Sequence, residues 1–272
     1  MWADKRAEIL FGGLCFSRFD FIFSSLAVLF KARSLNPPPM TLSKHFSDFT
    51  RLFFPNNCAG CGDELFGSKN LLCWHCLKEL PRTGFETNSK NPVAALFYGR
   101  IPLEQAFGWM YYNKTSLAKL LIQQVKYRNN QALGKYLGQL MAESMMEAGH
   151  YRDIDALIPL PLNKKKLARR GYNQSMLICE GMSPVLNKPI ETVAVIRSKF
   201  TQTQTRKNRL QRWLNVEQVF DLQDAHAIEG KHVLLVDDVI TTGATMEACG
   251  QILLKVAGLK LSMASLAYAS RI

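Results

Sequence analysis

The apolar residues in the middle of the chain recur at the three- and four-residue spacing of helices. One predicted helix begins after Ser116, whose hydroxyl can cap the first turn, and a second spans about 131–148. The first carries its apolar residues at Leu117, Leu120, Leu121 and Val125, and the second at Leu133, Leu137, Leu140 and Met141. Both faces are typical of a packed core and show no chemistry.

Short continuous apolar runs indicate buried strands elsewhere in the chain. The predicted strands are 93–98, 107–112, 156–160, 192–196, 232–236 and 261–269. From residue 156 onward they alternate with helices, one from about Asn173 and one over 245–256. Strands and helices that alternate at this spacing predict a parallel sheet covered by helices on both faces.

Residues 1–39 differ from the rest of the chain. Their apolar run, 21–30, is shorter than the roughly 20 residues that a membrane-spanning helix requires, and no small-residue cleavage site follows it. We therefore expect no integral membrane span and take Met40 as the start, with an exported leader or a disordered or interfacial extension as alternatives. The amphipathic stretch 46–53 then leads into a small module, 40–81, ahead of a larger domain, 82–272.

Composition adds a constraint on partners. The 272 residues are 47% apolar, which suffices for one large domain and a small one. The net charge of +12 is concentrated in two stretches, 164–170 and 197–212, which contain no carboxylate. Phosphates, nucleic acid and acidic lipid are therefore plausible partners.

Four of the seven cysteines form two Cys-x-x-Cys pairs, Cys58 with Cys61 and Cys73 with Cys76. This spacing predicts a structural zinc site, because four thiolates complete a tetrahedral shell and leave no position for water. Gly60 and Gly62 would let the first knuckle fold back. Two alternatives are that His75 replaces one thiolate and that a single pair acts in redox chemistry. A metal site of thiolates fits a reducing compartment, so we expect a cytoplasmic protein.

The segment 233–245 carries the most specific chemistry. Two carboxylates, Asp237 and Asp238, end a buried strand, where ligands of open parallel sheets bind, and they are suited to the hydroxyls of a ribose. The turn that follows offers backbone N–H groups and hydroxyls to an anion such as a 5′-phosphate. It consists of Thr241, Thr242, Gly243, Ala244 and Thr245. The alternative is that Asp238 and Thr241 only cap a helix.

This segment resembles the phosphoribosyl pyrophosphate signature of type I phosphoribosyltransferases, and residues 46–269 resemble the ComF/GntX family. The likeness rests on the cysteine cluster, the stretch ending at Tyr127, the segments 158–161 and 170–174, and the signature itself; 201–220 is also similar but departs at Lys207. The resemblance implies a type I phosphoribosyltransferase fold, a twisted parallel sheet flanked by helices, joined to an N-terminal zinc-ribbon-like module. It also implies binding of phosphoribosyl pyrophosphate with Mg²⁺.

The resemblance further places pyrophosphate on a loop over 159–170. Its basic residues are Lys164, Lys165, Lys166, Arg169 and Arg170, of which we select Lys166, Arg169 and Arg170, together with Asn173, as pyrophosphate contacts. The resemblance favours a lid over 197–212, with a disordered surface loop as the alternative. For any single lysine, a solvated surface position is the alternative.

The implied reaction is displacement of pyrophosphate at the anomeric carbon, with Asp237 and Asp238 the only candidates for a catalytic role. Neither a general base nor the acceptor base can be named from the sequence, and the oligomeric state is not predicted. Two rival functions stay open. One is a non-catalytic competence protein that binds single-stranded DNA or a helicase of the uptake machinery, and the other is a phosphoribosyl pyrophosphate sensor.

Overall fold

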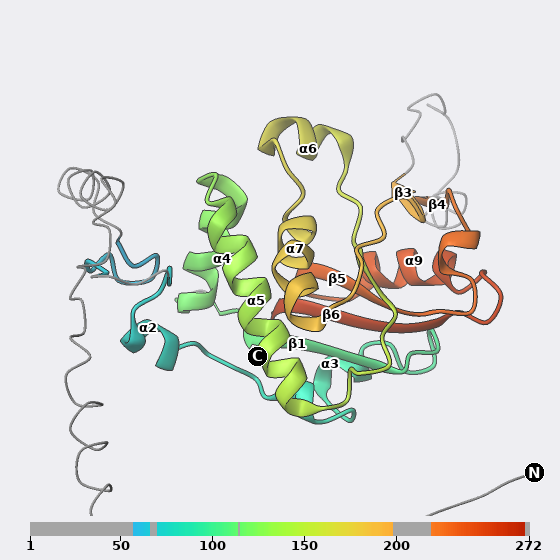
Figure 1. The fold of residues 1–272 in the computed structure, drawn as a ribbon, viewed down its shortest axis with the longest axis horizontal. Coiled ribbons are helices and arrows are strands. Elements are labelled where there is room, and N and C mark those ends of the chain that lie inside the picture. The colour runs from blue at the N-terminus through green and yellow to red at the C-terminus, as the bar shows by residue number, and fades with distance from the viewer. Residues whose placement is uncertain (1–56, 66–69, 114, 198–218, 270–272) are drawn as a thin grey trace, which may run out of the picture. The chain divides into compact units, whose positions relative to one another are not determined.

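The computed structural model describes residues 57–65, 70–113, 115–197 and 219–269, and these belong to one compact unit, Phe54–Ile272 (Figure 1). The predicted start at Met40, the helix over 46–53 and the lid over 197–212 lie outside the described residues, apart from Arg197. The helices are α2 (Trp74–Lys78), α3 (Pro92–Ala95), α4 (Leu117–Tyr127), α5 (Gln131–Ala148), α6 (Lys164–Arg170), α7 (Gln174–Leu186) and α9 (Ala244–Leu253). The strands are β1 (Gln105–Tyr111), β2 (Ala156–Pro159), β3 (Val195–Arg197), β4 (Phe220–Leu222), β5 (His232–Ile240) and β6 (Lys260–Tyr268).

The central sheet has four strands in the order β1-β6-β5-β2, and every neighbouring pair is parallel. Its two inner strands are the longest, and eight of their facing positions are paired between His232 and Ile240. Because helices cover both faces of the sheet, β5 and β6 are buried over most of their length and carry apolar residues on both faces. The predicted parallel sheet is confirmed.

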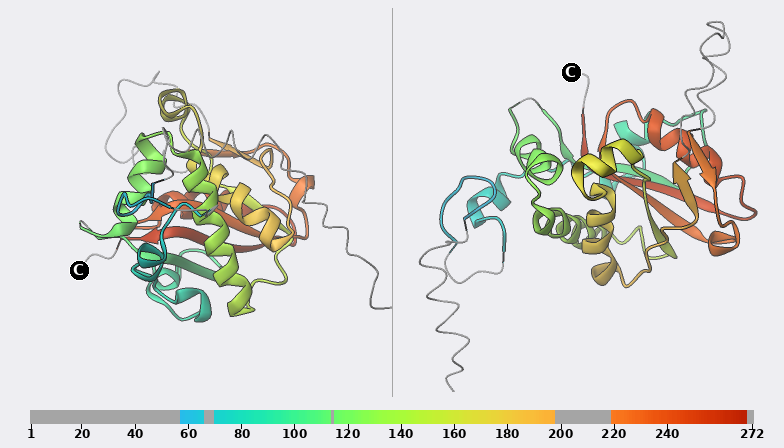
Figure 2. Two further views of the ribbon diagram at one scale, coloured as in Figure 1. Left: turned by 60° about the vertical axis from the view of Figure 1, so that its left-hand side comes forward. Right: turned by 90° about the horizontal axis from the view of Figure 1, so that it is seen from above.

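Successive residues of β5 divide between two hydrophobic clusters, as the alternation of a strand requires. Leu234 and Val236 pack with α4, α5 and α7, whereas Val233 and Leu235 pack with α3 and α9. Figure 2 shows α5 and α7 side by side across the first of these faces. The sheet therefore lies between two helical layers, and its carboxyl edge is left to the loops.

Two predicted strands need correction. Residues 93–98 form helix α3 and a turn, because Asn91 Oδ1 accepts hydrogen bonds from the amides of Val93 and Ala94 and Pro92 occupies the first helical position. The strand predicted at 192–196 does not join the parallel sheet. Its last residues belong to β3, which pairs only with β4 in a separate antiparallel ribbon, and Ile196 is exposed.

The predicted helix after Ser116 is confirmed, since Ser116 Oγ accepts a hydrogen bond from Lys119 N. One position of its apolar face is wrong, because Leu120 is 42% exposed and Ala118 and Ile122 are buried in its place. The second helix has the predicted bounds, and the helix from Asn173 begins with that residue as its N-cap.

Candidate functional site

The end of strand β2 creates the site, because β5 continues beyond it. The last ladder pair is Pro159 with Val236, and Leu160 N donates the next hydrogen bond to Val236 O. Strand β5 then continues to Ile240 beside β6 alone. Asp237 and Asp238, predicted at the end of the strand, thus lie within it on a stretch that has a neighbour on one side only.

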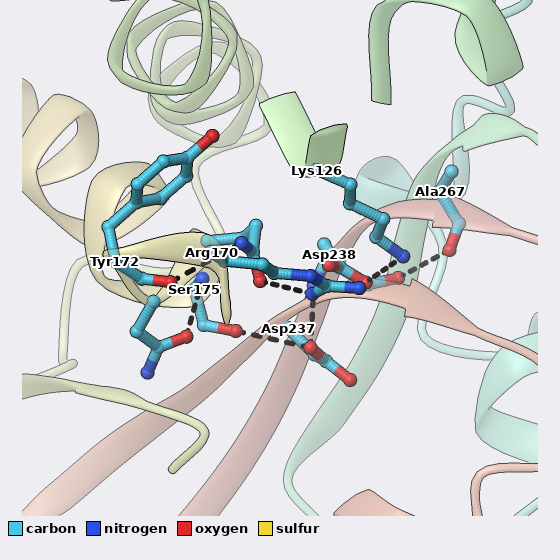
Figure 3. Close-up of polar contacts among 10 residues, drawn as sticks. Lys126, Arg170, Tyr172, Ser175, Asp237, Asp238 and Ala267 are labelled. Atoms are coloured by element: carbon cyan, nitrogen blue, oxygen red, sulfur yellow. Dashed lines mark hydrogen bonds and ion pairs between the residues drawn. The ribbon is translucent and has the colours of Figure 1, made fainter. Parts of the chain in front are cut away.

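The two carboxylates have different partners. Asp238 Oδ1 lies 2.8 Å from Lys126 Nζ, which comes from the last turn of α4. Asp237 Oδ1 accepts a hydrogen bond of 3.1 Å from Ser175 Oγ at the start of α7 and one of 2.8 Å from Asp238 N. Figure 3 shows these side chains gathered over the end of β5. Three separate elements therefore position the acidic pair.

The environment of Asp237 opposes its ionisation. Burial, followed by the negative charge of Asp238, raises the pKa of Asp237 from 3.8 to about 7, although Lys126 and the hydrogen bond from Ser175 act in the other direction. Near neutral pH the pair therefore changes charge readily. A ligand that brings hydroxyl donors or positive charge to this position would favour the ionised form.

The turn after β5 presents the features of an anion site. Thr241, Thr242, Ala244 and Thr245 are exposed, and the turn leads into the ten-residue helix α9. Gly243 is its N-cap with φ +75°, and a Cβ there would lie 2.8 Å from Phe97 Cε1. Only glycine meets both conditions without strain. Ala244 N donates to Thr242 Oγ1 at 3.4 Å, and the N–H groups that follow it in the first turn of α9 are left open to a bound anion.

Arg170 is the predicted pyrophosphate residue whose charged side chain is fixed beside the residues around the acidic pair. Its Nη1 donates a hydrogen bond of 2.6 Å to Gln174 Oε1, and its guanidinium lies 5.3 Å from the centre of the Tyr127 ring. Its Nε is buried and has no hydrogen-bond partner among the described residues. The side chain is thus held in place with a donor to spare.

The structure places the other predicted pyrophosphate residues differently. Asn173 caps α7 by accepting from Ser175 N, and its Nδ2 donates to Leu160 O at 2.9 Å, so it fixes the connection from β2. Lys166 and Arg169 are exposed on α6, as are Lys164 and Lys165. The segment 159–170, predicted as a loop, thus contains a short helix that projects beyond α7 on two extended connections (Figure 1).

Two residues of the site, Lys126 and Ser175, are not predicted from the sequence, and Gln174 is included only as the last residue of the segment 170–174. The stretch that ends at Tyr127 was noted only as part of a family likeness, and residues 170–174 stopped one position short of Ser175. The spacing of residues along the sequence does not indicate that the end of α4 contacts β5. The one available signal is the basic residue Lys126 in the last turn of an amphipathic helix.

The four cysteines predicted as metal ligands come together. Their sulfur atoms all lie within 4.8 Å of one another, and the Sγ atoms of Cys61 and Cys73 are 3.6 Å apart. Tetrahedral zinc thiolate geometry requires about 3.8 Å between sulfurs. The donor set therefore fits a metal ion. The second pair lies at the start of a helix and not in a loop, since Cys73 caps α2 and Cys76 belongs to that helix.

Backbone amides support thiolate charge in this cluster. Burial disfavours ionisation of Cys58, but N–H groups of Cys73, Cys61 and Gly60 outweigh it and lower the pKa of Cys58 to about 6. The thiol of Cys76 has its pKa raised, first by burial and then by the neighbouring cysteines. The Cys58 thiolate therefore forms easily, whereas the Cys76 thiol resists ionisation until a cation shares its charge.

Comparison with known proteins agrees with this arrangement. A family model described as phosphoribosyl transferase domain matches residues 173–271, which include α7, β5, the turn and β6. Competence protein F of Haemophilus influenzae is 30% identical over 215 residues, a match that covers 75% of this chain and 93% of that protein. The chain belongs to the ComF family.

Other ComF relatives match over shorter segments. The DNA utilization protein YhgH of Escherichia coli O157:H7 is 32% identical over 139 residues, which cover 50% of this chain and 60% of that protein. Among solved structures, the glutamine phosphoribosylpyrophosphate amidotransferase of B. subtilis covers 52% of this chain, at 17% identity and a TM-score of 0.37. The fold of this ComF protein is that of a type I phosphoribosyltransferase, with a parallel sheet between helices. In the described part of the chain, no helix has the length and apolar character to cross a membrane.

Proposed function

We propose that this ComF protein binds phosphoribosyl pyrophosphate with Mg²⁺ at the carboxyl edge of its sheet and transfers the phosphoribosyl group. The observation that carries the proposal is the continuation of β5 past β2, which presents Asp237 and Asp238 beside an exposed turn at the start of α9. Two carboxylates suit the ribose hydroxyls, and the free amides of the turn suit the 5′-phosphate.

The residues present also fit a magnesium ion. Hard cations such as Mg²⁺ take oxygen ligands and usually retain water and substrate phosphate. The carboxylate oxygens of Asp237 and Asp238 are the oxygen donors that would hold it, directly or through the ribose hydroxyls. When bound, Mg²⁺ would neutralise the charge that develops on departing pyrophosphate.

Arg170 would bind the pyrophosphate. Its guanidinium is oriented by Gln174 and the Tyr127 ring, and its buried Nε has an unused N–H. A fixed cation with a spare donor stabilises a leaving group that gains charge in the transition state. Lys166 and Arg169, which stand on the projecting helix α6, would contribute at longer range as part of a positive field.

We further propose that the four cysteines hold a structural zinc ion. All four positions of a tetrahedral ion would be filled by Cys58, Cys61, Cys73 and Cys76, so water would have no access to the metal. Zinc would then stabilise the fold of this module and take no part in the reaction.

Calorimetric titration with phosphoribosyl pyrophosphate and Mg²⁺ tests the main proposal. Wild type should bind, and the Asp237→Asn, Asp238→Asn double variant should lose at least about tenfold in affinity, or about 1.4 kcal/mol. A screen of purine and pyrimidine acceptors for pyrophosphate release then separates a transferase from a sensor, which would bind without turnover. Absence of binding by folded wild type would refute the proposal.

One observation favours a second function, the binding of single-stranded DNA. Lys164, Lys165, Lys166 and Arg169 are exposed together on α6, and the relatives carry the names DNA utilization protein and competence protein. Phosphate contacts of this kind would weaken steeply as salt increases. An oligonucleotide titration at two salt concentrations, with the four residues changed to alanine, would distinguish this function from sugar-phosphate binding. Binding of a helicase partner would be compared between wild type and the same four-residue variant.

A further inference from the structure

We propose that Gln124 is a positioning residue, which attaches the last turn of α4 to the cysteine cluster and thereby holds Lys126 and Tyr127 at the ligand site. The inference rests on the proposed function, because it names the chain's own means of ordering that site. Its consequence is that metal in the cysteine cluster and ligand at the acidic pair influence each other's binding.

The first half of the connection joins α4 to the cluster. Gln124 Nε2 donates a hydrogen bond of 2.5 Å to the carbonyl oxygen of Ala59, the residue that follows Cys58. The knuckle lies tightly between the cluster and this helix. A Cβ at Gly60 would come within 2.5 Å of Cys76 Sγ and 3.2 Å of Leu117 Cδ1. Movement of the knuckle is therefore transmitted to α4.

The second half joins α4 to the ligand site, and each of the next three residues takes part. Val125 O accepts a hydrogen bond of 2.5 Å from Tyr172 Oη, and Lys126 Nζ lies 2.8 Å from Asp238 Oδ1. The ring of Tyr127 lies under the guanidinium of Arg170. Since a turn of helix contains 3.6 residues, less than one turn separates these contacts from Gln124. The two sites are thus bridged by a single short segment.

A helix end needs such an attachment. The last carbonyls of α4 have no intrahelical partner, and Asn129 leaves the helix with φ 54°. Gln124 also attaches the following segment to the last turn, because its Oε1 accepts from Asn130 Nδ2 at 3.3 Å, and Asn130 caps α5. One amide therefore fixes the knuckle, the end of α4 and the start of α5. Without it, Lys126 and Tyr127 would lose their fixed orientation.

Gln123 supplies a matched control. It is the same residue type one position earlier, and its side chain is exposed. Within the described residues, this side chain makes no hydrogen bond. Methionine at either position keeps the length of the side chain and the helix propensity while removing the amide. The comparison of Gln124→Met with Gln123→Met therefore isolates the contacts of one amide.

The experiment uses the full, zinc-loaded chain and measures three quantities. These are affinity for phosphoribosyl pyrophosphate with Mg²⁺ by calorimetry, the rate of zinc release to a chelating dye with and without that ligand, and hydrogen exchange at residues 125–130 in the ligand-free protein. The variants are Gln124→Met, Gln123→Met, Lys126→Met and the double variant of Gln124 and Lys126. If Gln124→Met does not fold, Gln124→Glu replaces it, since glutamate keeps the shape but lacks the N–H donor.

Positioning through Lys126 gives a specific pattern. Gln124→Met should weaken ligand affinity about fivefold, a typical coupling between sites, and should have a clearly smaller effect once Lys126 is methionine, because only the contact through Tyr127 then remains. Because coupling is reciprocal, ligand should slow zinc release in wild type and in Gln123→Met but not in Gln124→Met. Equal affinities for the two single glutamine variants, or losses that add in the double variant, would overturn the inference.

Failure of the proposed function gives a different result. If folded wild type binds no phosphoribosyl pyrophosphate, hydrogen exchange in the ligand-free protein still tests whether Gln124 orders the end of α4. Faster exchange at 125–130 in Gln124→Met than in Gln123→Met would retain Gln124 as the residue that orders this turn. Equal exchange would remove the positioning role as well.

Discussion

Lys126 Nζ lies 2.8 Å from Asp238 Oδ1, and the two side chains are only 20% and 14% exposed. The pair joins the end of α4 to the middle of β5, two elements that are more than a hundred residues apart in the sequence. It also neutralises one of two adjacent carboxylates. Without this cation, two neighbouring negative charges would have to be held together in a largely buried position.

Removal of that cation should destabilise the ligand-free protein. In Lys126→Met, Asp238 keeps its charge and loses its partner, so we expect a loss of about 1–3 kcal/mol in the free energy of unfolding. Urea unfolding at neutral pH measures it. The double variant with Asp238→Asn should recover part of the loss, because the unpaired charge is then gone. Wild-type stability for Lys126→Met would show that the pair contributes nothing.

The raised pKa of Asp237 predicts a pH dependence of stability. Because the folded protein holds this proton up to about pH 7 and the unfolded chain releases it near 3.8, the contribution of Asp237 falls as pH rises between these values. Asn cannot ionise but can accept the same hydrogen bonds. Asp237→Asn should therefore be more stable than wild type at pH 8, by more than about 1 kcal/mol, the energy of one pKa unit. Thermal melting from pH 4 to pH 8 tests whether the difference grows with pH.

Gly243 should not tolerate a side chain. Alanine there would adopt φ +75° and also meet the Phe97 ring, so we expect a loss of about 1–3 kcal/mol together with weakened sugar-phosphate binding. Gly149→Ala is the matched control, since Gly149 has φ +76° and open space around its Cα. Equal melting temperatures for the two variants would remove the role assigned to Phe97. Partial recovery in Gly243→Ala with Phe97→Leu would support it.

Loss of one cysteine of the cluster should release the metal. Cys76→Ser removes a thiolate, so we expect less than about one tenth of the zinc content of wild type and a lower melting temperature. Elemental analysis after dialysis gives the content. Cys179→Ala is the control, because Cys179 is buried in α7 and is not one of the four clustered cysteines. Equal zinc in wild type and Cys76→Ser would contradict the metal site.

Local chemistry explains which parts of the fold could be predicted. Ser116, Asn173 and the apolar periodicities act within a few residues, and they gave α4, α5, α7 and the inner strands with small errors at the ends. The strand predicted at 93–98 failed because the cap from Asn91 outweighs β propensity there. Likewise, the strand near 192–196 has one exposed face and too little apolar length to enter a buried parallel sheet.

By itself, the sequence determined the chemistry of this protein: four thiolates at metal spacing, two adjacent carboxylates after a buried strand, and a hydroxyl-rich turn with one glycine. Each is a property of residues close together in the chain. The tertiary structure alone decided which distant residues serve them. Lys126, Ser175 and Gln124 acquire their partners Asp238, Asp237 and Ala59 only when helices and strands pack. No local pattern encodes such contacts, because packing depends on the whole chain.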